Sequence, residues 1–391
     1  MADWKNVRVG DVCEQIRGVS YKPADLHNNL DDNSVALLRA NNIFENALTY
    51  NDLVYVDNKK VSDSQYLKKG DILICASSGS KNLVGKAACL EEDRKLTFGA
   101  FCKVLRTNSI NHGFFKHYFF SQNYRITISN LSAGANINNI RAEDLDNLQI
   151  PFPPLETQKQ IAATLDKVTK IIAESKQLLK KYDLLIKSRF IEMFGDNPIE
   201  NWNVEKLRNT GNFKNGMNFS YEDNGFEINC LGVGDFKDNS VISETSVLPI
   251  IFLNEKPTDE YLLQKEDIVF VRSNGNKDLV GRCVLVYPDT LSTFSGFCIR
   301  YRKTSEKLNS IYLLQYLKMP NTRKRMSGRG ANIQNLNQQI LSNLEIPIPP
   351  LALQQQFAAF VQQIDKSKFT VQKSLEKSET LYKSLMQRYF A

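Results

Sequence analysis

The chain contains the same stretch of sequence twice. A shift of 196 residues places Asp71-Ile72-Leu73 on Asp267-Ile268-Val269 and Leu83-Val84-Gly85 on Leu279-Val280-Gly281. Because the repeat is half as long as the 391-residue chain, it is a tandem duplication of a domain-sized unit and not a solenoid of short repeats. The same shift also matches Phe98, Phe101 and Cys102 with Phe294, Phe297 and Cys298, Gly134-Ala135-Asn136 with Gly330-Ala331-Asn332, and Pro153-Pro154-Leu155 with Pro349-Pro350-Leu351.

Each half begins with a globular part, which we assign to residues 1–154 and 196–350. Short β-rich runs such as Asp71–Ala76 and Asp267–Arg272 are bounded by Ser, Gly and Asn turns. We expect a helix near residues 112–131 and its counterpart near 308–326, where Pro320 should kink or break it. The two globular parts are therefore predicted to be similar compact domains of the α/β (α+β) class.

A long helix is predicted to end each half, over residues 155–195 and 351–391. A Pro-Pro pair precedes each helix, Gly195 and Pro198 provide a stop for the first, and apolar residues recur in steps of three and four. Each helix would span about 58 Å, more than a small domain needs to cover its core. We favour an antiparallel coiled coil between the two helices, and the alternative is packing of each helix within its own half. The seam comprises Ile161, Leu165, Val168, Ile172 and Leu179 in the first helix, and Phe357, Val361, Ile364, Val371 and Leu375 in the second.

Most of the net charge of +7 at pH 7 lies outside the globular parts. Residues 1–154 carry +1 and residues 196–350 carry 0, whereas each helical segment carries +3. If the globular parts bind nucleic acid, they must do so through local basic patches, because their net charge provides little attraction.

The seven cysteines are scattered, and none forms a Cys-x-x-Cys pair. This pattern argues against a disulfide framework or a zinc site and favours reduced thiols in a cytoplasmic protein. The sequence has no apolar run near 18 residues, so we expect no transmembrane helix, and residues 1–5 do not resemble the start of a signal peptide.

Two similar domains joined by rigid helices provide two binding faces at a fixed separation. A protein that reads two half-sites on B-DNA needs this arrangement, because successive helical turns are about 34–36 Å apart. Since the two halves have diverged in sequence, the two half-sites should differ. The organisation therefore predicts recognition of a bipartite, asymmetric site on double-stranded DNA.

The duplicated helix entries carry a resemblance to a known family. Pro153-Pro154-Leu155 with Gln158 matches Pro349-Pro350-Leu351 with Gln354, and the repeated Leu-Val-Gly adds to the pattern. Two further features are the Gln-Ile-Ala-Ala-x-Leu-Asp run at 160–166 and the Lys-Ser-Arg-Phe sequence at 187–190. The whole chain resembles the specificity (S) subunit of type I restriction–modification systems.

The resemblance implies the following roles. Residues 1–154 and 196–350 would be target-recognition domains, each reading one half of a split DNA sequence. The helices at 155–195 and 351–391 would set the spacing, and their seam residues would bind two methyltransferase (M) subunits. Restriction/motor (R) subunits would complete the complex. The second helix lacks the Leu-Asp of the first after Gln356-Phe357-Ala358-Ala359, which weakens the equivalence of the two docking surfaces.

A polar loop around the repeated Leu-Val-Gly is the first candidate DNA contact. Its glycines are spaced too widely for a phosphate-binding Walker loop, and Ala87 follows Lys86 where that loop needs Ser or Thr. Side chains of Ser, Asn, Lys and Arg suit base edges and phosphates, and the alternative is a hairpin kept for its turn geometry. The candidates are Ser77, Ser78, Lys81, Asn82 and Lys86 in the first half, and Arg272, Asn274, Lys277 and Arg282 in the second.

A basic cluster in the second half is the other candidate DNA contact. It comprises Arg323, Lys324, Arg325 and Arg329, whereas the first half offers only Arg125 in the same region. The alternative is a solvated helix end whose cations favour the helix dipole. For Gly134-Ala135-Asn136 and Gly330-Ala331-Asn332, backbone contact with DNA and packing against the helix entries are equally plausible.

No catalytic motif is evident in the sequence. The three histidines have no partner motif, and there is no Asn/Asp-Pro-Pro-Tyr/Phe methyltransferase loop, nuclease constellation, metal site or cofactor loop. We therefore expect a non-catalytic chain without a cofactor. The alternatives are a free-standing DNA-binding regulator or anti-restriction decoy, and a coiled-coil adaptor that binds proteins and no DNA.

Overall fold

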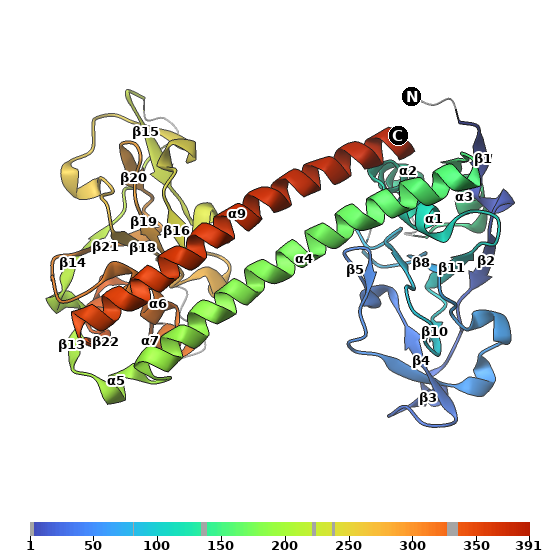
Figure 1. The fold of residues 1–391 in the computed structure, drawn as a ribbon, viewed down its shortest axis with the longest axis horizontal. Helices are drawn as coiled ribbons and strands as arrows, with labels where there is room; N and C mark the ends of the chain where they lie inside the picture. The colour runs from blue at the N-terminus through green and yellow to red at the C-terminus, as the bar shows by residue number, and fades with distance from the viewer. Residues whose placement is uncertain (1–3, 81, 134–138, 221–223, 237–238, 327–334) are drawn as a thin grey trace. The chain divides into compact units, whose positions relative to one another are not determined.

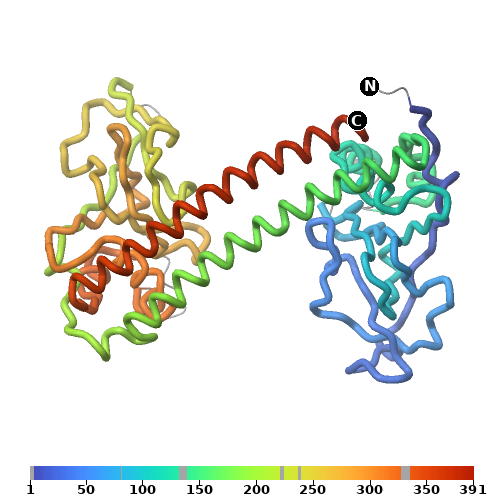
Figure 2. Tube along the Cα trace, in the orientation of Figure 1, coloured from blue at the N-terminus to red at the C-terminus, as the bar shows by residue number. Residues whose placement is uncertain are grey.

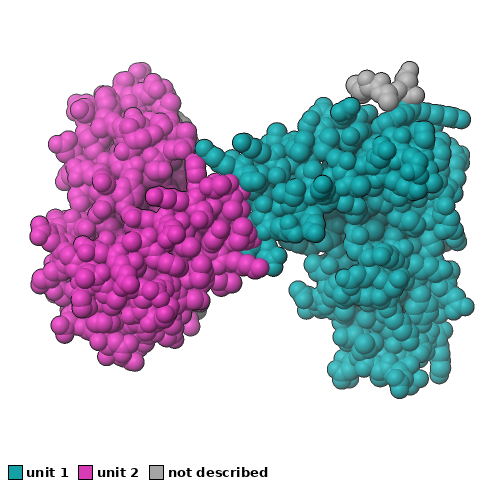
Figure 3. Space-filling view, viewed as in Figure 1, with its two compact units in different colours: residues 1–177, 372–391 teal, residues 178–371 magenta. Residues whose placement is uncertain are grey.

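The computed structural model describes residues 4–80, 82–133, 139–220, 224–236, 239–326 and 335–391 (Figures 1 and 2). The chain divides into two compact units (Figure 3). Unit 1 contains residues 1–177 and 372–391, and unit 2 contains residues 178–371. Each unit therefore combines one globular part with segments of both long helices.

Unit 1 is built on two four-stranded sheets. The first has the order β2-β11-β8-β9 and is antiparallel throughout, and the second has the order β10-β4-β7-β3 with a parallel β10–β4 pair. A short pair, β1–β12, joins the start of the globular part to its end. The bounds are β1 Asn6–Arg8, β2 Glu14–Arg17, β3 Leu26–His27, β4 Ser34–Leu38, β5 Ile43–Phe44, β6 Ala47–Leu48, β7 Val54–Asp57, β8 Ile72–Cys75, β9 Ala87–Cys89, β10 Leu96–Phe98, β11 Cys102–Arg106, β12 Gln149–Pro151, α1 His112–Phe119, α2 Gln122–Ala133 and α3 Ala142–Asp146.

Unit 2 repeats this plan with small changes. Its sheets have the orders β14-β21-β18-β19-β16 and β17-β15-β20, and β13–β22 is the short joining pair. The bounds are α5 Pro198–Asn201, β13 Val204–Lys206, β14 Gly211–Asn215, β15 Phe226–Leu231, β16 Val241–Ile242, β17 Ile250–Leu253, β18 Asp267–Val271, β19 Cys283–Val286, β20 Ser292–Phe294, β21 Cys298–Lys303, α6 Ser310–Lys318, α7 Pro320–Met326, α8 Gln338–Ser342 and β22 Glu345–Pro347. The mixed α and β content and the duplication agree with the predicted class.

The long helices are α4 Leu155–Phe194 and α9 Leu351–Phe390, and each contributes to both units. They pair in antiparallel fashion within each unit. In unit 1, Lys176 and Glu379 form an ion pair of 3.0 Å, and in unit 2, Lys368 and Asp183 form one of 2.6 Å. The helices also enter the globular cores, so both packing modes considered from the sequence are present.

The first turn of each long helix contains the buried glutamine of the Pro-Pro-Leu-x-x-Gln motif. The Gln158 Nε2 donates to the Pro153 carbonyl, and its Oε1 accepts from the amide of Asn111, which caps α1. Gln354 makes the same bonds to Pro349 and to Asn309, the cap of α6. Because both glutamines are almost fully buried, the motif fixes the helix entry onto the globular part.

The helix expected at 112–131 is wrong as a single element. It is two helices, α1 and α2, separated at Phe120 and Ser121. The Ser121 hydroxyl accepts a hydrogen bond from the Tyr124 amide, and this local bond starts the new helix without a proline. In unit 2, Pro320 begins α7 after α6 ends at Lys318, so the break predicted there is confirmed.

Buried ion pairs hold the central strands in both units. Asp71 accepts two hydrogen bonds from Arg106, at 2.9 and 2.6 Å, and Asp267 accepts two from Arg302, both at 2.8 Å. Both aspartates are almost fully buried, and such charges are tolerated only when they are paired. The repeated aspartates thus have a structural role in both units.

Candidate nucleic-acid interface

The repeated Leu-Val-Gly loop is braced by an arginine in each unit. Arg125 donates to the carbonyl oxygens of Asn82 and Val84, and Arg323 donates to those of Asp278 and Val280. The predicted DNA contacts Arg125 and Arg323 therefore have matching structural partners. Their guanidinium groups hold the loop in place through its backbone carbonyls. A DNA contact by either arginine would have to use the N–H groups that remain.

The glycines that close the loop have the geometry expected of a tight turn. Gly85 and Gly281 have φ values of +77° and +76°, which residues with a side chain rarely adopt. A Cβ on Gly85 would lie 2.5 Å from the Ile128 side chain. The loop is thus held close to α2 in unit 1, and its hairpin role and its proposed DNA role are compatible.

Polar side chains of this loop lie partly in solvent. Ser77 and Ser273 pair with Asn139 and Asn335 in equivalent isolated bridges. The remaining candidates divide by exposure: Asn82 and Lys277 are exposed, Ser78, Lys86, Arg272, Asn274 and Arg282 are half-buried, and Lys81 lies outside the described residues. The loop thus offers hydroxyl, amide and cationic groups together at the surface.

Two arginines of the basic cluster in unit 2 make hydrogen bonds within the chain, so they are less available for DNA than the sequence suggests. Burial lowers the pKa of Arg323, consistent with its bracing role, and Arg325 donates to the Tyr316 hydroxyl. Lys324 is exposed, and Arg329 lies outside the described residues. Within the part of the cluster that the structure describes, Lys324 is therefore the side chain best placed for a phosphate.

A pair of exposed phenylalanines was not among the sequence candidates. Phe101 and Phe297 occupy the same turn, before β11 and β21, with exposed fractions of 71% and 62%. Their backbones are held firmly: the amides of Ala76 and Ser77 donate to the Phe101 carbonyl, and those of Arg272 and Ser273 donate to the Phe297 carbonyl. The identity of the two residues in the repeat was the signal that could have found them.

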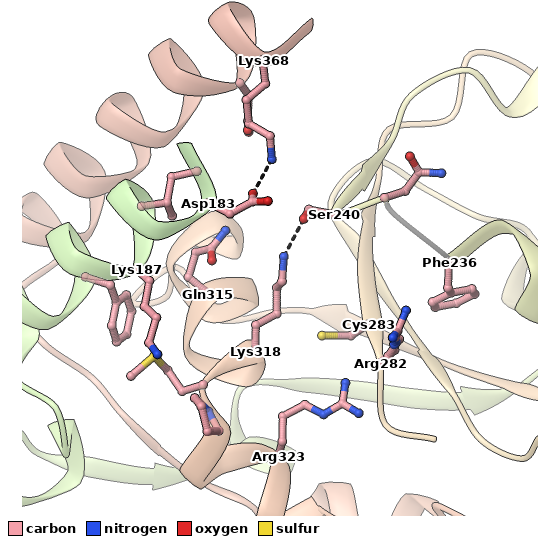
Figure 4. Close-up of a pocket in the computed structure, with 16 residues that line it drawn as sticks. Asp183, Lys187, Phe236, Ser240, Arg282, Cys283, Gln315, Lys318, Arg323 and Lys368 are labelled. Carbon is pink, nitrogen blue, oxygen red and sulfur yellow. Dashed lines mark hydrogen bonds and ion pairs between the residues drawn. The ribbon is translucent and has the colours of Figure 1, made fainter. Parts of the chain in front are cut away.

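A cavity of about 470 Å³ lies in unit 2 between the globular part and the helices (Figure 4). Its walls carry charges of both signs. Lys318 donates to the Ser240 hydroxyl at 2.5 Å, and Lys368 pairs with Asp183. Burial lowers the pKa of Lys318 and raises the pKa of Asp365. Because opposite charges face the same space, the cavity has no clear preference for an anion or a cation.

The predicted partner-binding residues are largely covered by the chain itself. Ile161, Leu165 and Val168 are buried in unit 1, as is Leu375, and Phe357 and Val361 are buried in unit 2. Ile172, Leu179, Ile364 and Val371 are half-buried. The large apolar residues of α4 and α9 that remain exposed are Leu155, Ile171, Leu178, Leu184, Leu185, Leu351, Phe369 and Leu381. A partner would meet these side chains first.

His117 and Asp166 form a polar junction between the globular part and the helices of unit 1. The two side chains are 2.9 Å apart, and Lys116 lies 2.8 Å from the same carboxylate. Burial raises the pKa of Asp166, but hydrogen bonds from His117 and Lys116 outweigh it and bring the pKa to about 2. Burial lowers the pKa of His117, against the effect of Asp166. The group connects α1 with α4, and Lys116 and Asp166 also line a small cavity of about 340 Å³.

Burial disfavours the thiolate form of the cysteines in this fold. Burial raises the pKa of every one of the seven thiols, to about 11 for Cys75 and Cys283. A thiol with a raised pKa is a poor nucleophile and a poor metal ligand. Among the described residues, there is no group of three or more His, Cys, Asp or Glu side chains that could hold a metal ion, and no helix is long and apolar enough to cross a membrane.

Comparison with known proteins places the chain in a family. Residues 1–181 and 199–379 each match the model described as the type I restriction modification DNA specificity domain. The specificity subunit of the type I restriction enzyme StySPI from Salmonella potsdam is 32% identical, over 99% of this chain and 88% of that protein. The specificity subunit of EcoKI from Escherichia coli (strain K12) is 31% identical over the same shares.

Solved structures show the same fold. The type I restriction–modification S subunit from M. genitalium matches with a TM-score of 0.63 and 17% identity, covering 100% of this chain and 96% of that chain. A structure from work on complex assembly and conformational transition of the type I restriction–modification system matches with a TM-score of 0.54 and 18% identity, covering 100% and 98%. The duplicated domains, the full-length relatives and the shared fold agree: the chain belongs to the family of type I restriction–modification DNA specificity subunits, whose part in such an enzyme is recognition of DNA and not catalysis.

Proposed function

We propose that this chain reads a bipartite, asymmetric sequence on double-stranded DNA. Residues 1–154 and 196–350 act as the two target-recognition domains, and each reads one half of the sequence. The observation that carries the proposal is that the two units share a backbone plan but differ in the polar groups on it. Shared braces such as Arg125 and Arg323 keep the geometry, and the differing side chains provide different half-sites.

The side chains proposed to contact DNA belong to the loop and the basic cluster. In unit 1 they are Ser77, Ser78, Lys81, Asn82, Lys86 and Arg125, and in unit 2 they are Arg272, Asn274, Lys277, Arg282, Arg323, Lys324, Arg325 and Arg329. The exposure of Asn82, Lys277 and Lys324 supports their role. Cationic groups of this kind give affinity that falls with salt, because binding releases counterions from the phosphates.

Type I specificity subunits work with methyltransferase and restriction subunits, and we propose that two methyltransferase subunits dock on the helices of this chain. Ile171, Leu178 and Leu185 are exposed on α4 and are seven residues apart, so they lie along one face of the helix. An apolar stripe of this kind suits a helical partner. The buried seam, including Leu165 and Phe357, would support docking by holding α4 and α9 in place.

The proposed site of action is the cytoplasm, where restriction subunits would join the assembled methyltransferase. The chain itself contributes no reaction step. In the assembly, a methyltransferase subunit would take the target base out of the duplex and modify it. This chain would determine only where on the DNA that happens.

A genome-wide map of adenine methylation tests the proposal. Cells that produce this chain with its methyltransferase are compared with cells that lack this chain. Methylation that depends on the chain and falls at a split sequence with a fixed gap supports it. Methylation that is unchanged, or absent in both strains, contradicts it and favours a free-standing DNA-binding regulator or a protein adaptor.

A further inference from the structure

One end of the globular part of unit 1 is hollow. A cavity of about 660 Å³ is lined by the residues that follow β2, β4, β8 and β10, so the carboxyl ends of four strands converge on it. Its walls bear Tyr21, Arg39, Asn41, Ser78 and the exposed ring of Phe101. These are aromatic, guanidinium, amide and hydroxyl groups, a mixture that suits base edges better than it suits a metal ion or a sugar phosphate alone.

The guanidinium of Arg39 lines this cavity with only part of its hydrogen-bonding capacity used by the chain. Its Nη2 donates to the Asp52 carbonyl at 2.8 Å, but its Nε is buried and has no hydrogen-bond partner. A buried donor without a partner costs free energy, so the unpaired Nε needs a partner from outside the chain, such as water or a bound ligand. Asn41, two residues further along the chain, is exposed at the same cavity.

The equivalent positions in unit 2 follow from the strand registers. Phe98 pairs with Leu38 in unit 1, and Phe294 pairs with Leu231 in unit 2. The next residue in each unit begins the same turn: the Arg39 amide donates to the Asn42 side chain, as the Gly232 amide donates to the Asp235 side chain.

The two units therefore differ in which strand end carries the polar groups. Arg39 and Asn41 of unit 1 correspond to Gly232 and Gly234 of unit 2, which have no side chain to offer. The reverse holds after β8 and β18. There unit 1 has Ala76 and Ser78, whereas unit 2 has Arg272 and Asn274. Each unit thus has one Arg-x-Asn sequence at this end of the domain, provided by a different strand.

We infer that Arg39 and Asn41 in unit 1, and Arg272 and Asn274 in unit 2, are the residues that determine the base sequence read by each unit. Arginine pairs in bidentate fashion with guanine and asparagine with adenine in the major groove. Phe101 and Phe297 are exposed on the adjacent turns, which backbone hydrogen bonds hold in place. Their rings would provide an apolar contact of the kind that suits a thymine methyl group. The pair in unit 1 follows β4, and the pair in unit 2 follows β18. Within its own half-site each pair would therefore contact bases at a different position, and so the two half-sites would differ.

The inference rests on the proposed DNA-reading function and deepens it. It is tested with the complex of full-length chain and methyltransferase, which selects duplexes from a pool with randomised positions. The main variant, Arg39→Gly with Asn41→Gly, gives unit 1 the residues of unit 2. We expect the base preference at one or two positions of one half-site to fall roughly tenfold or more, because one bidentate pair provides about that much discrimination. The other half-site should be unchanged.

Reciprocal and control variants sharpen the test. Arg272→Ala with Asn274→Ser gives unit 2 the residues of unit 1 and should relax only the other half-site. Asn41→Ala removes one exposed amide and should leave the fold intact. It therefore still tests the inference if the double variant does not fold. Arg94→Gln removes a surface arginine of unit 1 that does not line the cavity, and it should leave the selected sequence intact.

Two results would overturn the inference. The first is an unchanged selected sequence in both double variants. The second is a uniform loss of affinity for every duplex, which is the behaviour of phosphate contacts or of a damaged fold. If the wild-type complex itself selects no sequence, the proposed function fails as well. If the wild type selects a split sequence and the variants select the same one, only the inference fails.

Discussion

In both units the globular part is attached to the long helices by an equivalent pair of packed aromatic rings, which we call the apolar seat. The polar groups beside this pair differ between the units. In unit 1 the Phe390 ring lies 5.0 Å from that of Phe114, and in unit 2 the Phe194 ring lies 4.7 Å from that of Tyr312. Beside this seat, unit 1 has His117 bonded to Asp166. The shared rings show that apolar packing fixes the attachment, and the polar groups can vary around it.

The matching positions in unit 2 explain why its junction is simpler. Gln315 stands where α1 has His117, counted from the capping asparagines, and Gln362 stands where α4 has Asp166. Neither residue is charged. At this point of the junction unit 1 therefore has a histidine–carboxylate pair and unit 2 has two neutral glutamines, whereas the titratable groups of unit 2 between globular part and helices include Lys318 and Asp365. The two junctions should respond differently to pH and to mutation.

Removal of the seat should have the largest effect. Phe194→Ala deletes a ring that is 2% exposed and packs on Phe190, Tyr312 and Phe357, and we expect a loss of about 3–5 kcal/mol in the free energy of unfolding of unit 2. Phe390→Ala should cost unit 1 less, because the Phe390 ring packs on Phe114 at 5.0 Å and on Tyr118 at 6.2 Å, whereas the three rings around Phe194 all lie within 5.6 Å of it. Denaturant unfolding followed by hydrogen exchange in each unit measures both. Equal losses would contradict this asymmetry.

The buried ion pairs should show a smaller difference. Asp267→Asn should destabilise unit 2 by about 3 kcal/mol, because it leaves a buried arginine without its counter-ion. Asp71→Asn should cost unit 1 less, since Asp71 pairs with Arg106, whereas Asp267 has Arg302 at 2.8 Å and Arg300 at 3.9 Å. Urea midpoints of the two variants, compared with Asp93→Asn on the surface, provide the measurement. A larger loss for Asp71→Asn would refute the ranking.

The smallest effect expected is the pH dependence that His117 gives to unit 1. Burial holds the pKa of His117 below its ordinary value of 6.5, so below pH 6.5 the unfolded chain binds a proton that folded unit 1 does not. The stability of unit 1 should therefore fall as the pH is lowered from 7.5 to 5.5. Asp166, with a pKa of about 2, stays charged in this range.

His117→Gln, which copies Gln315 of unit 2, should remove part of this pH dependence. Hydrogen exchange of the α1 amides at pH 7.5 and 5.5, corrected for intrinsic rates, reports on it. The wild-type chain is the control for the variant, and the α6 amides of unit 2, where Gln315 takes the place of the histidine, report the response of a junction without it. An unchanged response of α1 in the variant would mean that His117 is not the titrating group.

The large elements could be predicted from the sequence because they rest on periodic or repeated signals. Two such signals, heptad spacing and the Pro-Pro entries, predicted helices where α4 and α9 lie, and Gly195, with a φ of +92°, follows the end of α4 as expected. The break between α1 and α2 was missed, because a serine hydroxyl and not a proline causes it. The heptad seam showed which residues are apolar but not whether the chain or a partner covers them.

Arg39 and Asn41 were missed because the alignment of the two halves of the sequence changes register near them. The shift of 196 residues that aligns most of the repeat does not hold at β4 and β15, where Leu38 corresponds to Leu231. Loops of different length separate these strands from their neighbours, so sequence self-comparison passes over Arg39 and Asn41. The strand registers show that these two residues of unit 1 correspond to Gly232 and Gly234 of unit 2.

The most direct test of two independent readers is an exchange of one of them. Residues 1–150 are replaced by the corresponding segment of another type I specificity subunit, and the methylated sequence is mapped in cells that contain the methyltransferase. Our account predicts that one half of the recognised sequence changes to that of the donor, while the other half and its orientation stay the same. A change in both halves, or in neither, would contradict it.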